Sequence, residues 1–315
     1  MNLPVLTDAE RIEVGTLYKK NPFEARRLGA SLISANVSAH LKQHLAGQSA
    51  DYQPLLYCWR GGMRSRSMAF ILHSIGWKTH IINGGYRTFR QYISSDLEQL
   101  FADTNLDLRV LSGLTGVGKT RLLKAIHESG GQILDLEGLA NHKGSLLGAT
   151  PDSEQPSQKK FESQLWYTLS ELDFSRPIYT EAESNRIGNI HCPAALWKAL
   201  SDASVINVSL PISERIILLR EEYPHFEENI SHLTSQLSHL TKLRGHEQIN
   251  EWRELTEANH WDAFVESVLV NHYDLCYRQP GHEKSNYQPA SDTINIPDAS
   301  YATYLTTAQS LLNRS

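Results

Sequence analysis

The chain has 315 residues, of which 40% are hydrophobic and 21% charged, and a formal net charge of −5. This composition is typical of a globular protein with about two domains. No apolar run reaches the roughly 20 residues of a membrane helix, and the first residues lack a signal-peptide pattern, so we expect a cytoplasmic protein without a membrane partner.

The first hundred residues predict a small α/β domain. A capping-box pattern at Thr7 starts a helix that reaches Lys20, and a second helix should run from Pro22 to about Leu45. The apolar run 54–57 predicts a strand, residues 63–75 a helix, and residues 80–82 another strand. A strand, loop, helix and strand in this order predict a parallel sheet.

A second α/β pattern follows a connecting helix over residues 86–102. The expected strands are 108–111, 132–136, 177–180 and 205–208, and the expected helical regions are 214–279 and 301–312. Four histidines in the helical region recur every seven residues, at His225, His232, His239 and His246, which predicts one stripe along a helix. We place the domains at residues 1–100 and 101–315.

A cysteine loop follows the first expected strand. Cys58 is followed by Trp59, Arg60, Gly61, Gly62, Met63 and Arg64, and then by a helix. The helix N-terminus together with Arg60 and Arg64 should stabilise a nucleophilic thiolate, and the glycines let the backbone curl around an anion. A buried structural cysteine is the usual alternative, but the adjoining arginines and glycines favour chemistry. The three cysteines, Cys58, Cys192 and Cys276, are too far apart to suggest a disulfide framework.

A phosphate-binding loop follows the strand at 108–111. Residues 113–120 match the pattern G-x-x-x-x-G-K-[ST] between a strand and a helix, the context that this motif requires. Backbone N–H groups around the glycines and the Lys119 ammonium should hold a di- or triphosphate, and Thr120 would hold Mg²⁺ if a metal is used. The phosphate-binding residues predicted here are Gly113, Gly116, Gly118, Lys119 and Thr120.

Acidic residues at the end of the strand near residue 180 are candidates to position a metal or water. We favour Glu181 or Glu183, although either could simply cap the following turn. Arg186, Arg215 and Arg220 are candidate phosphate contacts, each more commonly a surface salt-bridge partner.

The cysteine loop resembles that of rhodaneses, whose catalytic cysteine opens a loop of this kind. Their usual loop places an arginine five positions after the cysteine, whereas Arg64 is six positions after Cys58, the C-x5-R spacing of rhodanese-like and tyrosine phosphatases. The wider loop suits a larger anion or chalcogen. Tyr57 weakens the phosphatase interpretation, because those enzymes generally have histidine at that position.

The two loops together resemble the bacterial tRNA 2-selenouridine synthase family, a rhodanese domain fused to a P-loop domain. The matching segments extend over nearly the whole chain: residues 57–65, 84–87, 135–144, 155–158 and 181–188. The resemblance implies an α/β fold with an N-terminal rhodanese-like parallel-sheet domain, followed by a P-loop α/β domain with a helical C-terminal part.

The resemblance also implies a reaction. Selenium replaces sulfur at C2 of the wobble 2-thiouridine in tRNA, after the sulfur is geranylated with geranyl diphosphate, and selenophosphate donates the selenium. Cys58 would carry selenium as an S-selanylcysteine, Arg60 and Arg64 would stabilise the anion, and the P-loop would bind a diphosphate, either geranyl diphosphate or a nucleotide. Trp59 is a candidate for stacking on the flipped uridine. A selenophosphate-producing enzyme is a candidate partner.

Two further expectations concern the first domain. Residues 1–105 carry 12 Lys and Arg against 8 Asp and Glu, which permits a polyanionic partner. Rhodanese domains normally have strands before the Asn-Leu-Pro found at residues 2–4, so we expect the domain to be truncated at its start and less stable than a form extended upstream.

Two rival functions remain open at the level of sequence. One is a C-x5-R phosphatase with a regulatory nucleotide-binding domain. The other is a non-enzymatic P-loop module that binds nucleotide and RNA. Neither explains the additional matching segments.

Overall fold

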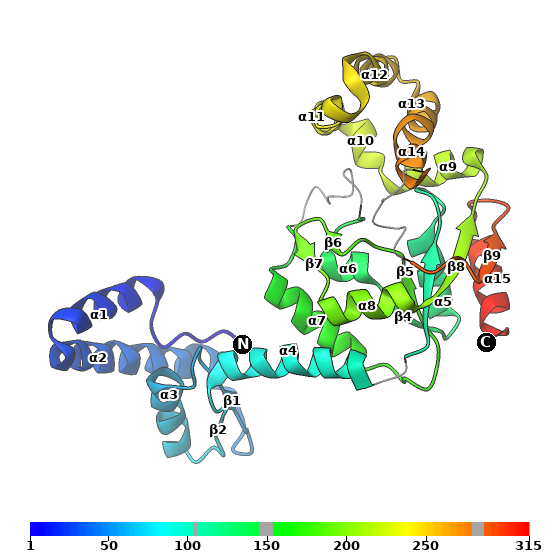
Figure 1. Ribbon diagram of the computed structural model, residues 1–315. Helices are drawn as coiled ribbons and strands as arrows, with labels where there is room; N and C mark the ends of the chain where they lie inside the picture. The colour runs from blue at the N-terminus through cyan, green and yellow to red at the C-terminus, as the bar shows by residue number, and fades with distance from the viewer. Residues whose placement is uncertain (104–105, 145–153, 279–286, 315) are drawn as a thin grey trace. The chain divides into compact units, whose positions relative to one another are not determined.

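The structure is a computed structural model that describes residues 1–103, 106–144, 154–278 and 287–314 (Figure 1). The chain forms two compact units, Met1–Ser94 and Ser95–Ser315. Helix α4 (Gly85–Asp103) contains the junction between them. No helix among these residues is long and apolar enough to span a membrane.

The first unit is mostly helical around a two-stranded sheet. Strands β1 (Leu55–Leu56) and β2 (His80–Ile81) pair in parallel, and α3 lies between them in sequence. The expected second helix is divided, because its last turn is a π-helix, η1. The other elements are α1 (Asp8–Lys20), α2 (Pro22–His40), η1 (Leu41–Leu45) and α3 (Met63–Ser74).

Local signals explain where the first helices begin. The Thr7 hydroxyl accepts a hydrogen bond from the Glu10 N–H, and the Glu10 carboxylate accepts one from the Thr7 N–H, so the predicted capping box is present. Asn21 caps α2, and Pro22 occupies its first turn, where a missing N–H costs nothing.

A small apolar core holds the first unit together. It consists of Val5, Val37, Leu45, Met68, Leu72 and Trp77. Several large apolar side chains near the cysteine loop remain exposed, among them Tyr57 (61%) and Met63 (76%). The Cys58 loop therefore packs on only a small apolar core.

The second unit is built on a five-stranded sheet in the order β4-β5-β3-β8-β9, in which every pairing is parallel. The predicted α/β architecture is confirmed here. Its strands are β3 (Leu108–Ser112), β4 (Gln132–Leu134), β5 (Ile178–Glu181), β8 (Ser204–Ser209) and β9 (Asp292–Asn295). The sequence had not predicted β9, nor the antiparallel hairpin of β6 (Arg186–Ile187) and β7 (Ile190–His191).

Helices complete the sheet layer. Helix α15 packs against α5, and both contribute to one buried cluster with β3, β8 and β9. The helices of this layer are α5 (Lys119–Glu128), α6 (Leu136–Ala140), α7 (Gln158–Ser170), α8 (Ala194–Asp202) and α15 (Tyr301–Leu312).

A helical region with its own core lies between β8 and β9 in sequence, shown in yellow-green to orange in Figure 1. It contains α9 (Ile212–Glu222), α10 (Pro224–Glu228), α11 (Ile230–Ser238), α12 (Thr241–Glu257), α13 (Trp261–Val268), η2 (Leu269–Tyr273) and α14 (Asp274–Arg278). Gln279, the last residue of the expected helical range, lies outside the described residues.

The predicted histidine stripe is wrong. His225, His232 and His246 lie in three different helices, α10, α11 and α12, and His239 caps the end of α11. Residues seven apart share one stripe only within a continuous helix. Here the backbone leaves helical geometry at Asn229, between α10 and α11.

Candidate functional site

The phosphate-binding loop has the predicted context. It connects β3, which ends at Ser112, to α5, which begins at Lys119. Gly118 caps the helix at φ +75°, and a Cβ at this position would collide with the Tyr304 hydroxyl. This position therefore requires glycine for two reasons, backbone conformation and space.

A cavity of about 220 Å³ opens on this loop. Of the predicted phosphate-binding residues, Gly116, Gly118, Lys119 and Thr120 line it. Gly113, the first residue of the loop, does not line the cavity, and a Cβ there would collide with the Val208 carbonyl. The backbone N–H groups at the start of α5 and the Lys119 ammonium suit an anion in this cavity.

Buried contacts from distant segments fix the loop from behind. The Tyr304 hydroxyl of α15 donates to the Val117 carbonyl at 2.9 Å. The Arg215 Nε of α9 donates to the Thr115 carbonyl at 2.8 Å, and its two terminal nitrogens donate to the Asp274 carboxylate at 3.0 and 2.7 Å. Arg215 is therefore an internal brace rather than a phosphate contact.

Three glutamates gather beside the loop. The Thr120 hydroxyl donates to Glu137 Oε2 at 3.0 Å, and the Glu137 N–H donates to Glu181 Oε1 at 2.6 Å. Glu181 ends β5 directly beside β3, with Leu111 as its partner in register. Glu137 and Glu183 line the cavity, whereas Glu181 is fully buried and its Oε2 has no hydrogen-bond partner.

The electrostatics of this cluster favour bound protons. Burial, and then the charge of Glu183, raise the pKa of Glu137 to about 8, although Lys119 opposes the shift. Burial and the neighbouring Glu137 also raise the pKa of Glu181 well above its usual range. At neutral pH the cluster therefore retains protons that isolated carboxyl groups would release.

Glu137 lies in the segment 135–144, which the sequence marked by its resemblance without a definite role for this residue. The segment Asp135-Leu-Glu-Gly follows β4, and the Asp135 carboxylate caps α6 by accepting from the Gly138 N–H at 2.7 Å. That cap places Glu137 in the first turn of α6, next to the phosphate-binding loop. An N-cap three residues before a glycine is the signal that could have identified it.

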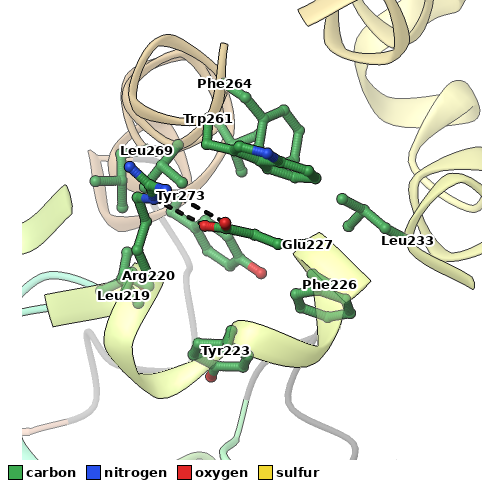
Figure 2. Close-up of a pocket in the computed structure, with 13 residues that line it drawn as sticks. Leu219, Arg220, Tyr223, Phe226, Glu227, Leu233, Trp261, Phe264, Leu269 and Tyr273 are labelled. Atoms are coloured by element: carbon green, nitrogen blue, oxygen red, sulfur yellow. Dashed lines mark hydrogen bonds and ion pairs between the residues drawn. The ribbon is translucent and has the colours of Figure 1, made fainter. Parts of the chain in front are cut away.

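A second, apolar cavity of about 80 Å³ adjoins the first (Figure 2). Four residues line both cavities: Thr115, Leu219, Tyr223 and Tyr273. The remainder of the apolar cavity is lined mainly by side chains of the helical region, including Phe226, Leu233, Trp261, Phe264 and Leu269. An ion pair of Arg220 with Glu227, with a shortest separation of 2.8 Å, lies along one side. The sequence had not predicted this cavity.

The Cys58 loop forms a separate site in the first unit. Partial burial raises the pKa of the thiol, but hydrogen bonds from the Ser65 hydroxyl and from the N–H groups of Ser65, Arg60 and Gly62 outweigh this effect and lower it to about 7. The Ser65 Oγ lies 3.3 Å from the sulfur. A large share of the thiol is therefore ionised at neutral pH, as a nucleophile requires.

The predicted arginines have different positions in this site. Arg64 lines the same surface cavity as Cys58, whereas Arg60 contributes its backbone N–H to the thiolate. Trp59 is 48% exposed, and its ring centroid lies 5.4 Å from that of Tyr86. Ser65 is the residue that sequence reasoning missed, and its position directly after the arginine of C-x5-R was the available signal.

A glycine turn supports the Cys58 loop. The N–H groups of Tyr86 and Arg87 donate to the carbonyls of Cys58 and Trp59 at 2.9 and 3.0 Å. Gly85 adopts φ +64°, and a Cβ there would collide with the Cys58 carbonyl. The segment Gly84-Gly-Tyr-Arg87 therefore maintains the shape of the loop.

The other two cysteines have different surroundings. Burial, and then the charges of Glu183 and Glu181, raise the pKa of Cys192 to about 12, which makes this thiol a poor nucleophile. Cys276 lines the P-loop cavity, with its sulfur 3.3 Å from an Arg244 nitrogen. All three cysteines are free thiols.

The described residues contain no group of three or more His, Cys, Asp or Glu side chains that could hold a metal ion. A magnesium ion bound with a phosphate ligand needs fewer protein donors, because it keeps several waters and takes oxygens from the substrate. The Thr120 hydroxyl, and the Glu137 carboxyl group once it releases its proton, are oxygen donors suited to such an ion.

Comparison with known proteins shows where the chain belongs. Residues 106–293 match the family described as tRNA 2-selenouridine synthase AAA domain. Proteins named tRNA 2-selenouridine synthase from Nitrosomonas europaea and Aeromonas salmonicida are each 36% identical over 71% of this chain, and one from Psychromonas ingrahamii is 34% identical over 70%. These matches cover 58%, 60% and 59% of the respective relatives, so the chain spans about three fifths of their length. No solved structure matches it. The chain belongs to the tRNA 2-selenouridine synthase family.

Proposed function

We propose that this chain is a tRNA-modifying transferase that replaces sulfur by selenium at C2 of wobble 2-thiouridine. Geranyl diphosphate alkylates the sulfur first, and selenophosphate then supplies selenium. The relatives bear the name of this activity, and the residues of both sites supply the chemistry that it needs. A cytoplasmic location, tRNA as the substrate and a selenophosphate-producing enzyme as a partner belong to the same proposal.

The observation that carries this proposal is that the phosphate cavity and an apolar cavity share four lining residues and so lie side by side. A nucleotide would bring a ribose and a polar base next to its phosphates, whereas the walls beside this P-loop are leucine and aromatic side chains. A diphosphate with a hydrocarbon chain matches both parts: its anion would lie on Lys119 and the α5 N-terminus, and its chain among the apolar residues.

The first step would form one bond and break another at the same carbon. The thiocarbonyl sulfur of the uridine attacks C1 of the geranyl group as the C1–O bond breaks, and pyrophosphate leaves. Lys119 and the loop N–H groups stabilise the charge that develops on the leaving group. Thr120 and Glu137 would hold Mg²⁺, which would neutralise part of the same charge.

The second step is assigned to the Cys58 loop. Alkylation turns the sulfur into a leaving group and makes C2 electrophilic. The selenium of selenophosphate attacks C2, the C–S bond breaks and geranylthiol leaves with a proton, and water then cleaves the Se–P bond and releases phosphate. A thiol with a pKa near 7, which accepts from N–H groups and lines the same cavity as Arg64, suits the binding and activation of a selenium-phosphate anion. The half-exposed Trp59 is proposed to stack on the uridine. A rhodanese-like fold of the first unit belongs to this assignment.

The test measures tRNA nucleosides by mass spectrometry in cells that lack their own enzyme and express variants of this chain. Cys58→Ser should eliminate selenium nucleosides while an S-geranyl nucleoside persists, and Lys119→Ala should eliminate both. Cys192→Ser and Lys124→Ala are matched controls, because Cys192 is a poor nucleophile and Lys124 is exposed on the same helix. Normal selenium nucleosides in Cys58→Ser would contradict the proposal.

The C-x5-R phosphatase hypothesis retains one supporting observation, the Ser65 hydroxyl beside the ionisable Cys58 thiol. Hydrolysis of p-nitrophenyl phosphate that is lost in Cys58→Ser and independent of tRNA would support it. We expect instead that tRNA and selenophosphate together are required for turnover at Cys58.

A further inference from the structure

The apolar cavity has a near end and a far end relative to the phosphate-binding loop. Thr115, Leu219, Tyr223 and Tyr273 line both cavities and therefore form the near end. Among the side chains that line only the apolar cavity, those farthest from Leu219 form the far end. They include Phe226, Leu233 and Trp261, which Figure 2 shows around the side of the cavity that is remote from Leu219.

Aromatic packing makes the far end rigid. The Phe226 ring stacks on Tyr223 with a centroid distance of 5.6 Å and an interplanar angle of 2°. The Trp261 ring meets Phe264 edge to face at 6.0 Å and 88°. Phe226 and Trp261 are only 9% and 8% exposed, and both belong to the buried core of the helical region. Side chains packed in this way cannot move aside without disturbing the core.

We propose that Phe226 and Trp261 form an end wall that sets the length of the hydrocarbon chain accepted on the diphosphate. This inference rests on the proposed function, because it takes a prenyl diphosphate as the ligand. The P-loop fixes the position of the diphosphate, and thereby of C1, so the chain must extend past Tyr223 and Tyr273 toward the wall. A ligand with one more isoprene unit would meet the two rings.

The dependence of affinity on chain length has two causes: burial of the hydrocarbon chain favours binding, and collision of the chain with the end wall opposes it. Each methylene that enters the cavity increases affinity about fourfold, until the chain reaches the wall. Beyond that point, additional carbons must displace packed rings or remain outside in water. A single methylene too many or too few in an apolar pocket changes the preference between two ligands by about 10- to 200-fold. The length of the cavity is therefore a direct determinant of substrate choice.

The experiment measures binding of the full chain to pyrophosphate and to prenyl diphosphates of five, ten and fifteen carbons by calorimetry. Wild type should bind the ten-carbon ligand at least about tenfold more tightly than the fifteen-carbon ligand. Phe226→Ala should reduce this ratio by about tenfold or reverse it, and Trp261→Phe should reduce it by a smaller factor. Affinity for pyrophosphate should remain unchanged in both variants.

A matched control lies in the same core. Trp252 is fully buried in the helical region but does not line the cavity. Trp252→Phe removes a similar amount of packed surface, so it should weaken the core without changing the ratio of the two affinities. A substitution in the opposite sense, Val265→Phe, should fill the cavity and shift preference toward the five-carbon ligand.

The outcomes separate this inference from the function on which it rests. If wild type binds pyrophosphate no less tightly than every prenyl diphosphate, the geranyl assignment fails. If wild type prefers the ten-carbon ligand, but Trp261→Phe keeps the ten-to-fifteen-carbon ratio of Trp252→Phe and Val265→Phe does not favour the five-carbon ligand, the end wall is wrong. Trp261→Phe and Val265→Phe still test the end wall if Phe226→Ala does not fold.

Discussion

The two candidate sites share one local design and differ in what holds it. In each, a parallel strand ends in a glycine-rich loop that leads into a helix: β1 into α3 at Cys58, and β3 into α5 at Lys119. The hydrogen bonds that lower the pKa of Cys58 come from residues within seven positions. The phosphate-binding loop instead depends on Arg215 and Tyr304, which are 100 and 187 positions from the carbonyls they bind.

This difference suggests that the ionisation of Cys58 is determined within its own segment, although the turn at residues 84–87 supports the loop, whereas the second site depends on the whole of its unit. The Cys58 loop has a small core beneath it, and large apolar residues beside it are exposed. The phosphate-binding loop lies on a five-stranded sheet and is fixed from behind by buried side chains. Substitutions can test the comparison. One removes a distant side chain that contacts the phosphate-binding loop, and another removes a nearby hydroxyl that contacts the Cys58 thiol.

The largest effect is expected for Arg215→Leu. It leaves Asp274 as a buried charge without its partner and removes the donor to Thr115. Breaking a buried ion pair in this way typically costs about 3–5 kcal/mol of the free energy of unfolding. Urea unfolding of the full chain measures the loss, together with reduced affinity for pyrophosphate.

Two comparisons sharpen that prediction. Arg220→Ala breaks more exposed ion pairs, with Glu227 and Asp262, and should cost only about 0–1 kcal/mol. The double variant Arg215→Leu with Asp274→Leu removes both charges and should recover part of the stability. Equal losses for Arg215→Leu and Arg220→Ala would show that the distant brace is unimportant.

A smaller effect is expected from the proton held by Glu137. Its pKa is about 8 in the folded chain, compared with 4.5 for an ordinary glutamate. Between these values the unfolded chain releases the proton and the folded chain keeps it, so the free energy of unfolding falls as pH rises from 4.5 to 8. The contribution is at most about 1.4 kcal/mol per pH unit, and it is lost in Glu137→Gln.

The measurement is urea unfolding at several pH values between 5 and 8. Glu137→Gln should have a shallower decline of stability with pH than wild type, whereas Glu257→Gln, at an exposed position, should follow wild type. Parallel curves for wild type and Glu137→Gln would show that the carboxyl cluster does not hold this proton.

The features predicted correctly from the sequence lie mostly in segments whose local structure is determined by a short motif. The P-loop match predicted the strand, loop and helix around Lys119, and the capping box predicted the start of α1, because these signals act within a few residues. The final helix, α15, has the predicted bounds, but its role does not follow from them. Nothing near Tyr304 in sequence indicates that its hydroxyl binds a loop 187 residues away.

The apolar cavity illustrates why the remainder was not predicted. Its walls come from α9, α10, α11, α13 and η2, whose apolar residues follow the helical period of any core. Periodicity identifies the buried face of each helix, but not a space left between helices. The histidine stripe failed for a related reason, since a seven-residue spacing has meaning only within one continuous helix.

The smallest effect is expected for Ser65→Ala, which tests the local site. Ser65 contributes its hydroxyl and its backbone N–H to the Cys58 thiolate, and only the hydroxyl is lost in the variant. The N–H groups of Arg60 and Gly62 remain, so the pKa of Cys58 should rise from about 7 by roughly one unit, without returning to the ordinary value of 9. The midpoint of the alkylation rate against pH, measured with Cys192 and Cys276 replaced by serine, reports this shift.

Ser67→Ala is the control, because the Ser67 hydroxyl donates to the Met63 carbonyl on the same helix. A shift as large in Ser67→Ala would mean that the position of α3, rather than the Ser65 hydroxyl, determines the ionisation of Cys58, and the site would then depend on its surroundings as much as the phosphate-binding loop does.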